Sequence, residues 1–521
     1  MKTTFSRRSF LKGSAAAAAA LGTPPLPARA SGADDTENGL FSLLRMTQYG
    51  PVKGCTAPDG QLCWYGIPYG ASSAGDARWT APQEPARWLA VKDCTSPAPM
   101  AYQYSSCPLG TEDCLTLDIH AASGAKDRPV LVYLHSSFLT GSPEELPGLS
   151  EDAGCVFVGV SYRLGLFGWN CLPALTTGPD ATGNFALLDI ARALDWVKEN
   201  IHAFGGDPDN ITLCGFADGG RAAAALTGSE PFRGRFQRAI VLSGGLELTR
   251  PEDAIPRLAE AFAPLAVADG LFPDLASAAK WLISPDASVR TWLCGLEPSR
   301  IAALGADMDA FPCLFADGIV LPESGCIQSH VPLLLLSSAT EFSAVVLHDL
   351  RPASEEAVAF AVKYGSALCR WSSTEAIAEA LASGSSPVWL GLIDYGGADS
   401  RTPIPGLGSF HGIALALLSA QSSYASCIDL SSEGAQALAA RLVRVVSDFT
   451  FSGDPGWQRW DADDRTTLRL DADSQHCYSD FTRYPDTRDS ISAEMEADAT
   501  LSAKEKQHIL QLFFSGWYYK M

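Results

Sequence analysis

Several short stretches of this chain are apolar at nearly every position, and they predict buried β-strands. The segments Pro129–Leu134 and Cys155–Tyr162 hold almost no polar side chain. A strand that is apolar on both faces belongs in a sheet covered on both sides, which is typical of parallel sheets flanked by helices. Further strands are expected at Phe41–Tyr49, Leu62–Tyr69, Leu117–His120, Ile211–Cys214, Ala239–Ser243, Pro332–Leu336 and Pro387–Ile393.

Segments with a helical repeat lie between these strands. The segment 185–204 places one apolar stripe along a helix, and Gly205-Gly206 ends it. Long helices are also expected at 433–449 and 502–514. Residues from about 251 to 312 read as short helices broken by prolines, an insertion placed to roof a site. The pattern predicts an α/β fold with a large, mostly parallel central sheet, helices on both faces and this helical insertion.

The strand at 211–214 runs into a Gly-x-x-x-Gly turn and then into an alanine-rich helix. Strand, tight turn and helix in this order are typical of a nucleophile elbow, which lifts one side chain above the sheet. Gly215 and Gly219 stand two residues to either side of Ala217. The side chain presented at the apex is therefore a methyl group, where a nucleophile is expected.

The first 30 residues predict a twin-arginine export signal. Arg7 and Arg8 lie in Ser-Arg-Arg-Ser-Phe-Leu-Lys, an alanine run follows, and Ala28-Arg29-Ala30 is a small-residue cleavage site. The apolar run is too short for a permanent membrane anchor, so no membrane span is expected. The protein should fold in the cytoplasm and then be exported to the periplasm, the cell envelope or the medium. Residues 31–521 are expected to form one domain.

Composition and charge indicate which ligands and partners this protein is not expected to bind. The 521 residues are 47% hydrophobic and carry a formal net charge of −21, without a basic patch, which argues against binding nucleic acid. The 14 cysteines and eight histidines show no metal-ligand spacing, so neither a metal nor another cofactor is expected. One or two disulfides are expected within a cluster near the mature N-terminus, formed by Cys55, Cys63, Cys94, Cys107 and Cys114.

Seven motifs in order indicate a family. They are Gly66–Tyr69, Glu112–Leu115, Tyr162–Gly165, Gly183–Asp189, Trp196–Ile201, Phe204–Thr212 and Ser452–Pro455. With these motifs the chain resembles the type-B carboxylesterases, the cholinesterase-like branch of the α/β-hydrolases. The resemblance implies an α/β-hydrolase fold and a catalytic triad in the order nucleophile, Glu, His.

The resemblance also assigns positions to the triad. Glu341, in Thr-Glu-Phe after an apolar strand, matches the family's acid, and His411, in a His-Gly pair, matches its histidine. Ser243 matches a serine that supports those two residues. Ala217 stands at the position of the nucleophile.

Three departures from the family pattern meet at the predicted reaction centre. The family's Gly-Glu-Ser-Ala-Gly reads Gly-Phe-Ala-Asp-Gly, which brings in Phe216 and Asp218 beside Ala217. A methyl group cannot attack an acyl carbon, and a carboxylate at 218 opposes a developing oxyanion. The family's oxyanion loop, His-Gly-Gly-Gly-Phe, is one residue shorter here and carries Ser136 and Ser137 in place of glycines.

Two functions remain open from the sequence. The first is an exported, non-catalytic relative that binds a small apolar or ester-like ligand or a protein partner. The second is a carboxylic ester hydrolase with an unconventional centre, in which His411 and Glu341 act with water or with Ser136 or Ser137. An aspartate nucleophile at Asp218 fits the turn less well, because it would put Phe216 where a small residue is needed.

Overall fold

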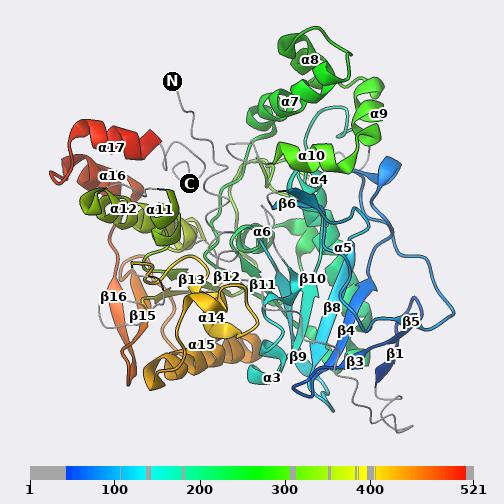
Figure 1. Ribbon diagram of the computed structural model, residues 1–521. Coiled ribbons are helices and arrows are strands. Elements are labelled where there is room, and N and C mark those ends of the chain that lie inside the picture. Colours follow the sequence, from blue (N-terminus) through cyan, green and yellow to red (C-terminus); the bar gives the residue numbers. More distant parts are fainter. Residues whose placement is uncertain are drawn as a thin grey trace.

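The computed structural model describes residues 43–511, except for 106, 137–141, 179–181, 306–311, 350–353, 382–383, 385, 396–403 and 405. Within this part of the chain, one central sheet has eleven strands (Figure 1). In spatial order they are β16 (Cys477–Arg483), β15 (Thr466–Ala472), β14 (Val388–Ile393), β13 (Leu333–Ser338), β12 (Arg238–Leu242), β11 (Gly206–Phe216), β9 (Arg128–Leu134), β10 (Val156–Val160), β8 (Thr116–Ala121), β4 (Leu62–Pro68) and β3 (Cys55–Thr56).

The sheet is parallel through its centre and antiparallel at its ends. Every neighbouring pair from β10 through β9 and β11 to β15 is parallel. The pairs β15–β16, β8–β10, β4–β8 and β3–β4 are antiparallel. The predicted mostly parallel sheet of an α/β-hydrolase is confirmed, although β3, β15 and β16 were not predicted.

Each face of the sheet has its own core. In β9, Val130 and Val132 point into one buried cluster and Leu131 and Tyr133 into the other, as the two-residue period of a strand requires. Helix α5 (Phe185–Asn200) packs in the first cluster, and α14 (Ile413–Leu418) and α15 (Glu433–Ser452) pack in the second. This double coverage explains why the strands are apolar at consecutive positions.

The predicted insertion forms a lobe of helices α7 (Pro251–Ala268), α8 (Leu275–Leu282), α9 (Ala287–Gly295) and α10 (Pro298–Leu304), drawn in green at the top of Figure 1. The expectation of proline breaks is wrong for α7, which continues through Pro256 and Pro264. Its Leu258 and Phe262 are fully buried, and this packing holds the helix together despite the missing backbone donors.

A third buried cluster lies near the C-terminus. Helices α11 (Ser343–Asp349), α12 (Glu355–Ser373), α16 (Arg488–Ala497) and α17 (Ala503–Ile509) contribute to it, and α13 (Glu375–Leu381) follows α12. The expected helix at 502–514 is described only as far as residue 511. Besides short 3₁₀ helices, the described chain also has α3 (Leu149–Asp152), α4 (Gly165–Gly168), α6 (Asp218–Leu226) and the short strands β1 (Leu44–Met46), β2 (Pro51–Lys53), β5 (Lys92–Asp93), β6 (Gln103–Ser105) and β7 (Cys107–Leu109).

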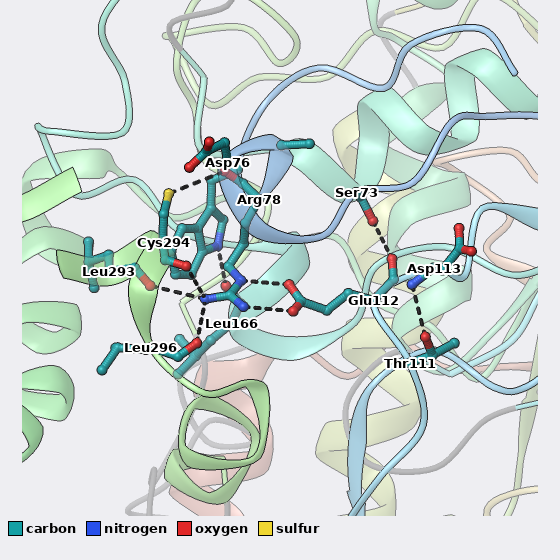
Figure 2. A network of polar contacts seen from close by, with 12 residues as sticks. Ser73, Asp76, Arg78, Thr111, Glu112, Asp113, Leu166, Leu293, Cys294 and Leu296 are labelled. Atoms are coloured by element: carbon teal, nitrogen blue, oxygen red, sulfur yellow. Dashed lines mark hydrogen bonds and ion pairs between the residues drawn. The ribbon is translucent and has the colours of Figure 1, made fainter. Parts of the chain in front are cut away.

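The buried side chain of Arg78 connects the lobe of α7 to α10 to the rest of the molecule (Figure 2). Arg78 donates from Nε and Nη2 to the two carboxylate oxygens of Glu112, over 2.5 and 2.6 Å. Its Nη1 donates to carbonyl oxygens at the end of α9, those of Leu293, Cys294 and Leu296. One guanidinium therefore forms an ion pair with a buried carboxylate and also donates to carbonyl groups at the C-terminal end of α9 that lack partners within the helix.

The fourteen cysteines all carry free thiols in this structure. The expectation of one or two disulfides among Cys55, Cys63, Cys94, Cys107 and Cys114 is not supported. Cys55 and Cys63 are antiparallel partners across β3 and β4 with both thiols free, and Cys94, Cys107 and Cys114 lie on other strands and loops. No helix in the described part of the chain combines the length and the apolar character needed to cross a membrane.

Candidate active site

The turn between β11 and α6 has Ala217 at its apex. Ala217 has φ 50° and ψ −117°, which places it in the positive-φ region that residues other than glycine rarely adopt. A Cβ atom on Gly215 would overlap the carbonyl oxygen of Gly219, and one on Gly219 would overlap that of Leu134. Both glycines are therefore required by close backbone approach, and the turn is as tight as a nucleophile elbow.

Hydrogen bonds hold this turn on both sides of its apex. The backbone N–H of Ala217 donates to the carbonyl of Leu242 on the neighbouring strand, over 3.0 Å. The backbone N–H of Arg221 donates to the carbonyl of Ala217, over 2.9 Å, and starts the helix. The geometry that would expose a nucleophile is thus complete, but the side chain is a methyl group.

Glu341 and His411 lie together next to this turn. Glu341 follows β13 and His411 precedes α14, and His411 Nδ1 is hydrogen-bonded to Glu341 Oε1. The aromatic ring of Phe216 packs on the imidazole with a centroid separation of 4.8 Å. Phe216 therefore connects the histidine to the residue just before the apex. Tyr424, which the sequence did not single out, packs edge-on against Phe216 at 5.8 Å.

The carboxylate of Glu341 is buried and has several donors. Ser243 Oγ donates to Glu341 Oε2 over 3.2 Å, and Ser338 donates to the same oxygen from its backbone N–H, over 3.1 Å, and from its hydroxyl. Burial raises the pKa of Glu341, but the charge of His411 and these hydrogen bonds outweigh it and lower the pKa below its ordinary value. The pair is arranged to keep the carboxylate ionised and the imidazole oriented.

Ser338 was missed by sequence reasoning. It ends β13, three residues before Glu341, within a run of small polar residues that carries no motif.

Asp218 is the first residue of α6, and its side chain contacts the segment that follows β9. Ser136 Oγ donates to Asp218 Oδ2 over 3.5 Å, and a guanidinium nitrogen of Arg221 lies 3.6 Å from Asp218 Oδ1. Burial raises the pKa of Asp218, while the charges of Arg221 and His411 act against that shift. The structure thus joins Asp218 and Ser136 at the predicted oxyanion region, whereas Ser137 lies outside the described residues.

His135, directly before Ser136, is fixed within the fold. Its ring stacks on Tyr162 with a centroid separation of 5.0 Å, and its Nδ1 lies 2.8 Å from the carbonyl oxygen of Ser136. Burial lowers its pKa to about 4, so the imidazole is neutral near pH 7. His135 therefore adds no positive charge to the oxyanion region.

A pocket of about 460 Å³ lies away from this candidate site and is lined by residues of α3, α14 and α15. None of the site residues above contributes to its lining. No group of three or more His, Cys, Asp or Glu side chains in the described ranges is arranged to hold a metal ion.

Comparisons with known proteins agree with this architecture. Residues 42–255 match the profile of the carboxylesterase family, and residues 4–24 match that of the twin-arginine translocation (TAT) pathway signal sequence. The para-nitrobenzyl esterase of Bacillus subtilis is 37% identical over 238 residues, which are 43% of this chain and 48% of that protein. Esterase B1 of Culex pipiens is 34% identical over 239 residues, 43% of this chain and 44% of that protein.

Solved structures match over a longer range. A PNB esterase structure is 25% identical, with a TM-score of 0.68 over 87% of this chain and 99% of that one. A thermophilic PNB esterase structure has a TM-score of 0.70 at 24% identity, over 86% of this chain and 99% of that one. In sequence, the matched part spans about half the length of the curated relatives. The fold likeness thus extends beyond the region where the sequences still align.

Proposed function

We propose that this exported chain, which belongs to the carboxylesterase family, is a binding protein that has lost the family's acyl-transfer reaction. The observation that carries the proposal is the methyl group of Ala217 at the apex of an otherwise complete elbow. In a serine protease, removal of the nucleophile lowers turnover about a million-fold, because no covalent acyl intermediate can form. The occupant we propose is a small apolar or ester-like ligand or a protein partner.

Asp218 supports loss of catalysis independently of Ala217. In this fold class, the residue after the nucleophile supplies one backbone donor to the oxyanion. A carboxylate about 5 Å from an oxyanion opposes it by roughly 3 kcal/mol at an effective dielectric constant near 20. Its contacts with Ser136 and Arg221 keep the Asp218 side chain in this region instead of free in solvent. Restoring a hydroxyl at 217 would leave this repulsion in place.

We further propose that residues 31–521 form one hydrolase-type domain and that the helical insertion, about 251–312, covers the ligand site. The buried contacts of Arg78 with the end of α9 support a fixed position for the insertion. A fixed cover would shield a bound ligand from water.

The test is an esterase assay on the mature protein with short-chain aryl esters. We expect turnover at the level of a heat-denatured control, little recovery in Ala217→Ser, and a further gain when Asp218→Ala is added to Ala217→Ser. Ester hydrolysis well above the control that disappears in His411→Ala would overturn the proposal. Strong recovery by Ala217→Ser alone would show that the oxyanion region is intact.

A second candidate is a hydrolase with an unconventional centre. The hydrogen bond between Ser136 and Asp218, together with the charge interaction between Asp218 and His411, favours it. In that reaction His411, oriented by Glu341, would act as general base for water or for a loop serine. An organophosphonate probe tests the serine route: covalent labelling that Ser136→Ala removes supports the hydrolase, and absence of labelling excludes a loop serine and leaves the water route to the esterase assay with His411→Ala.

A further inference from the structure

A second set of reactive side chains lies near the β3 end of the central sheet. Cys63 on β4 and His120 on β8 face each other in antiparallel register. The Cys63 sulfur is 3.3 Å from His120 Nδ1, and His120 Nε2 is 3.0 Å from Glu144 Oε1. Glu144 belongs to the short 3₁₀ helix η2 (Pro143–Glu145) that follows β9 in the chain.

This order of groups is that of an activated nucleophile. A thiol lies within hydrogen-bonding reach of an imidazole, and the far nitrogen of that imidazole is held by a carboxylate. The thiol has further polar neighbours: the side chain of Tyr65 is hydrogen-bonded to it, and the carbonyl oxygen of Gln61 lies 3.9 Å away. Burial lowers the pKa of His120, but the hydrogen bonds with Cys63 and Glu144 outweigh it and raise the pKa to about 10. An imidazole of raised pKa at this distance is placed to accept the proton of the thiol.

A second thiol stands directly opposite the first. Cys55 on β3 is the antiparallel partner of Cys63. Directly opposed residues of such a pair lie about 4.5–5.5 Å apart at Cα, within the roughly 4.4–6.8 Å that a disulfide spans. Strand β3 is two residues long and ends the sheet, and Cys55 is half-buried. Such an edge opens locally more easily than the centre of a sheet, which gives a small reagent a route to the buried Cys63.

We propose that Cys63 is an oxidation site for hydrogen peroxide, with His120 as its base and Cys55 as the thiol that completes a disulfide. In the first step Cys63 gives its proton to His120, and its sulfur attacks one peroxide oxygen. The O–O bond breaks, the leaving hydroxide takes the proton back as water, and Cys63 becomes a sulfenic acid. In the second step the Cys55 sulfur attacks the Cys63 sulfur, the S–O bond breaks, and the hydroxyl leaves with the Cys55 proton as water. Two thiols and one peroxide give one disulfide and two waters.

The export route sets the order in which folding and oxidation of this pair take place. A twin-arginine substrate folds in the cytoplasm, where thiols stay reduced, and meets oxidants only after export. The folded structure therefore places the pair side by side before any oxidant acts on it.

The chain provides its own comparison cysteine. Cys155 is as buried as Cys63, but its sulfur is hydrogen-bonded to a backbone carbonyl, that of Leu149, at 3.4 Å. Burial raises the pKa of Cys155 to about 12. If burial alone set reactivity, Cys155 and Cys63 would react at similar rates.

The test exposes the reduced mature protein to hydrogen peroxide and follows each thiol by alkylation and peptide mass spectrometry. We expect Cys63 and Cys55 to disappear together, about tenfold or more faster than Cys155, and to yield the Cys55–Cys63 peptide pair. In Cys55→Ala, dimedone should label Cys63 as the sulfenic acid. Oxidation of Cys63 no faster than that of Cys155 would overturn the proposal.

Two variants separate the proposed base from a structural role. His120→Gln should slow oxidation of Cys63 about tenfold while the rate at Cys155 stays unchanged. If His120→Gln loosens the fold, Cys155 will react faster as well, and the decision then rests on Glu144→Gln, which changes a partly exposed residue. Glu144→Gln should also slow the oxidation of Cys63. An unchanged Cys63 rate in the folded variants would contradict the assignment of His120 as base.

Discussion

Ala217 adopts a strained backbone conformation, although its methyl side chain cannot act as a nucleophile. A residue other than glycine at φ 50° costs on the order of 1–3 kcal/mol, and it persists only where its surroundings enforce it. Here the hydrogen bonds to Leu242 and from Arg221, with the close approach of Gly215 and Gly219, enforce it. The strained turn is thus a property of the fold and does not depend on a nucleophile.

We predict that Gly219→Ala destabilises the protein by about 3 kcal/mol or more, because the new methyl would overlap the carbonyl oxygens of Leu134 and His135. Gly295→Ala is the matched control, since a Cβ there meets nothing within 4 Å, and it should change stability by less than about 0.5 kcal/mol. Urea unfolding of both variants measures the difference. Equal midpoints would contradict the packing argument.

A second prediction concerns pH and Glu145. Burial raises the pKa of Glu145 from 4.5 to about 7, against a hydrogen bond from Tyr133 that lowers it. Between these two values the unfolded chain releases a proton that the folded protein keeps, so the contribution of Glu145 to stability falls as pH rises. The stability of Glu145→Gln relative to the unsubstituted protein should therefore rise across this range, by at most about 1.4 kcal/mol per pH unit.

Urea unfolding at several pH values between pH 4.5 and 7 tests this sign, and the same series is continued below pH 4.5 for the comparison variant. Glu341→Gln is the comparison variant, because the pKa of Glu341 is lowered in the fold. Its carboxylate stabilises the protein above its unfolded-state pKa, and that stabilisation is lost as pH falls, so the stability of Glu341→Gln relative to the unsubstituted protein should rise toward acid. The same pH trend in both variants would contradict one of the two assignments.

At the scale of elements, the lobe of α7 to α10 depends on contacts with distant parts of the chain. Arg78 is separated by more than two hundred residues from the α9 carbonyls that it binds, and its carboxylate partner Glu112 lies on a third segment. The lobe is therefore expected to unfold together with the part of the molecule built on the central sheet.

We predict that Arg78→Met lowers stability by about 3–5 kcal/mol, because it leaves the buried carboxylate of Glu112 unpaired. Protease cleavage within 251–304 should become faster. Arg233→Met is the control, because it breaks an exposed ion pair with Glu230 and should cost less than about 1 kcal/mol. Equal protease sensitivity of the two variants would contradict the fastening role of Arg78.

At the scale of the whole molecule, export and folding are linked. The signal at residues 4–24 directs the chain to the twin-arginine pathway, and the net charge of −21 favours solubility after export. A large sheet with most pairings between strands far apart in the chain must therefore form before export.

We predict that replacing Arg7 and Arg8 together with lysine leaves the protein folded but inside the cell, because the paired arginines are the recognised feature of the signal. Immunoblots of cell fractions measure the distribution. The charge of the segment is unchanged in this variant, so export at the normal level would show that charge alone directs the chain.

The sequence by itself determined the signal, the central strands and the position of Ala217, because each is written in neighbouring residues: a motif, an apolar run, two glycines around a turn. The tertiary structure alone decided which distant side chains meet. Glu341 and His411 are 70 residues apart, and Cys63 and His120 are 57 apart; the family resemblance predicted the first pair, but no local pattern indicated the second. The continuous helix α7 and the donors around Glu341 likewise depend on packing and on contacts between distant segments, which leave no periodic trace in the chain.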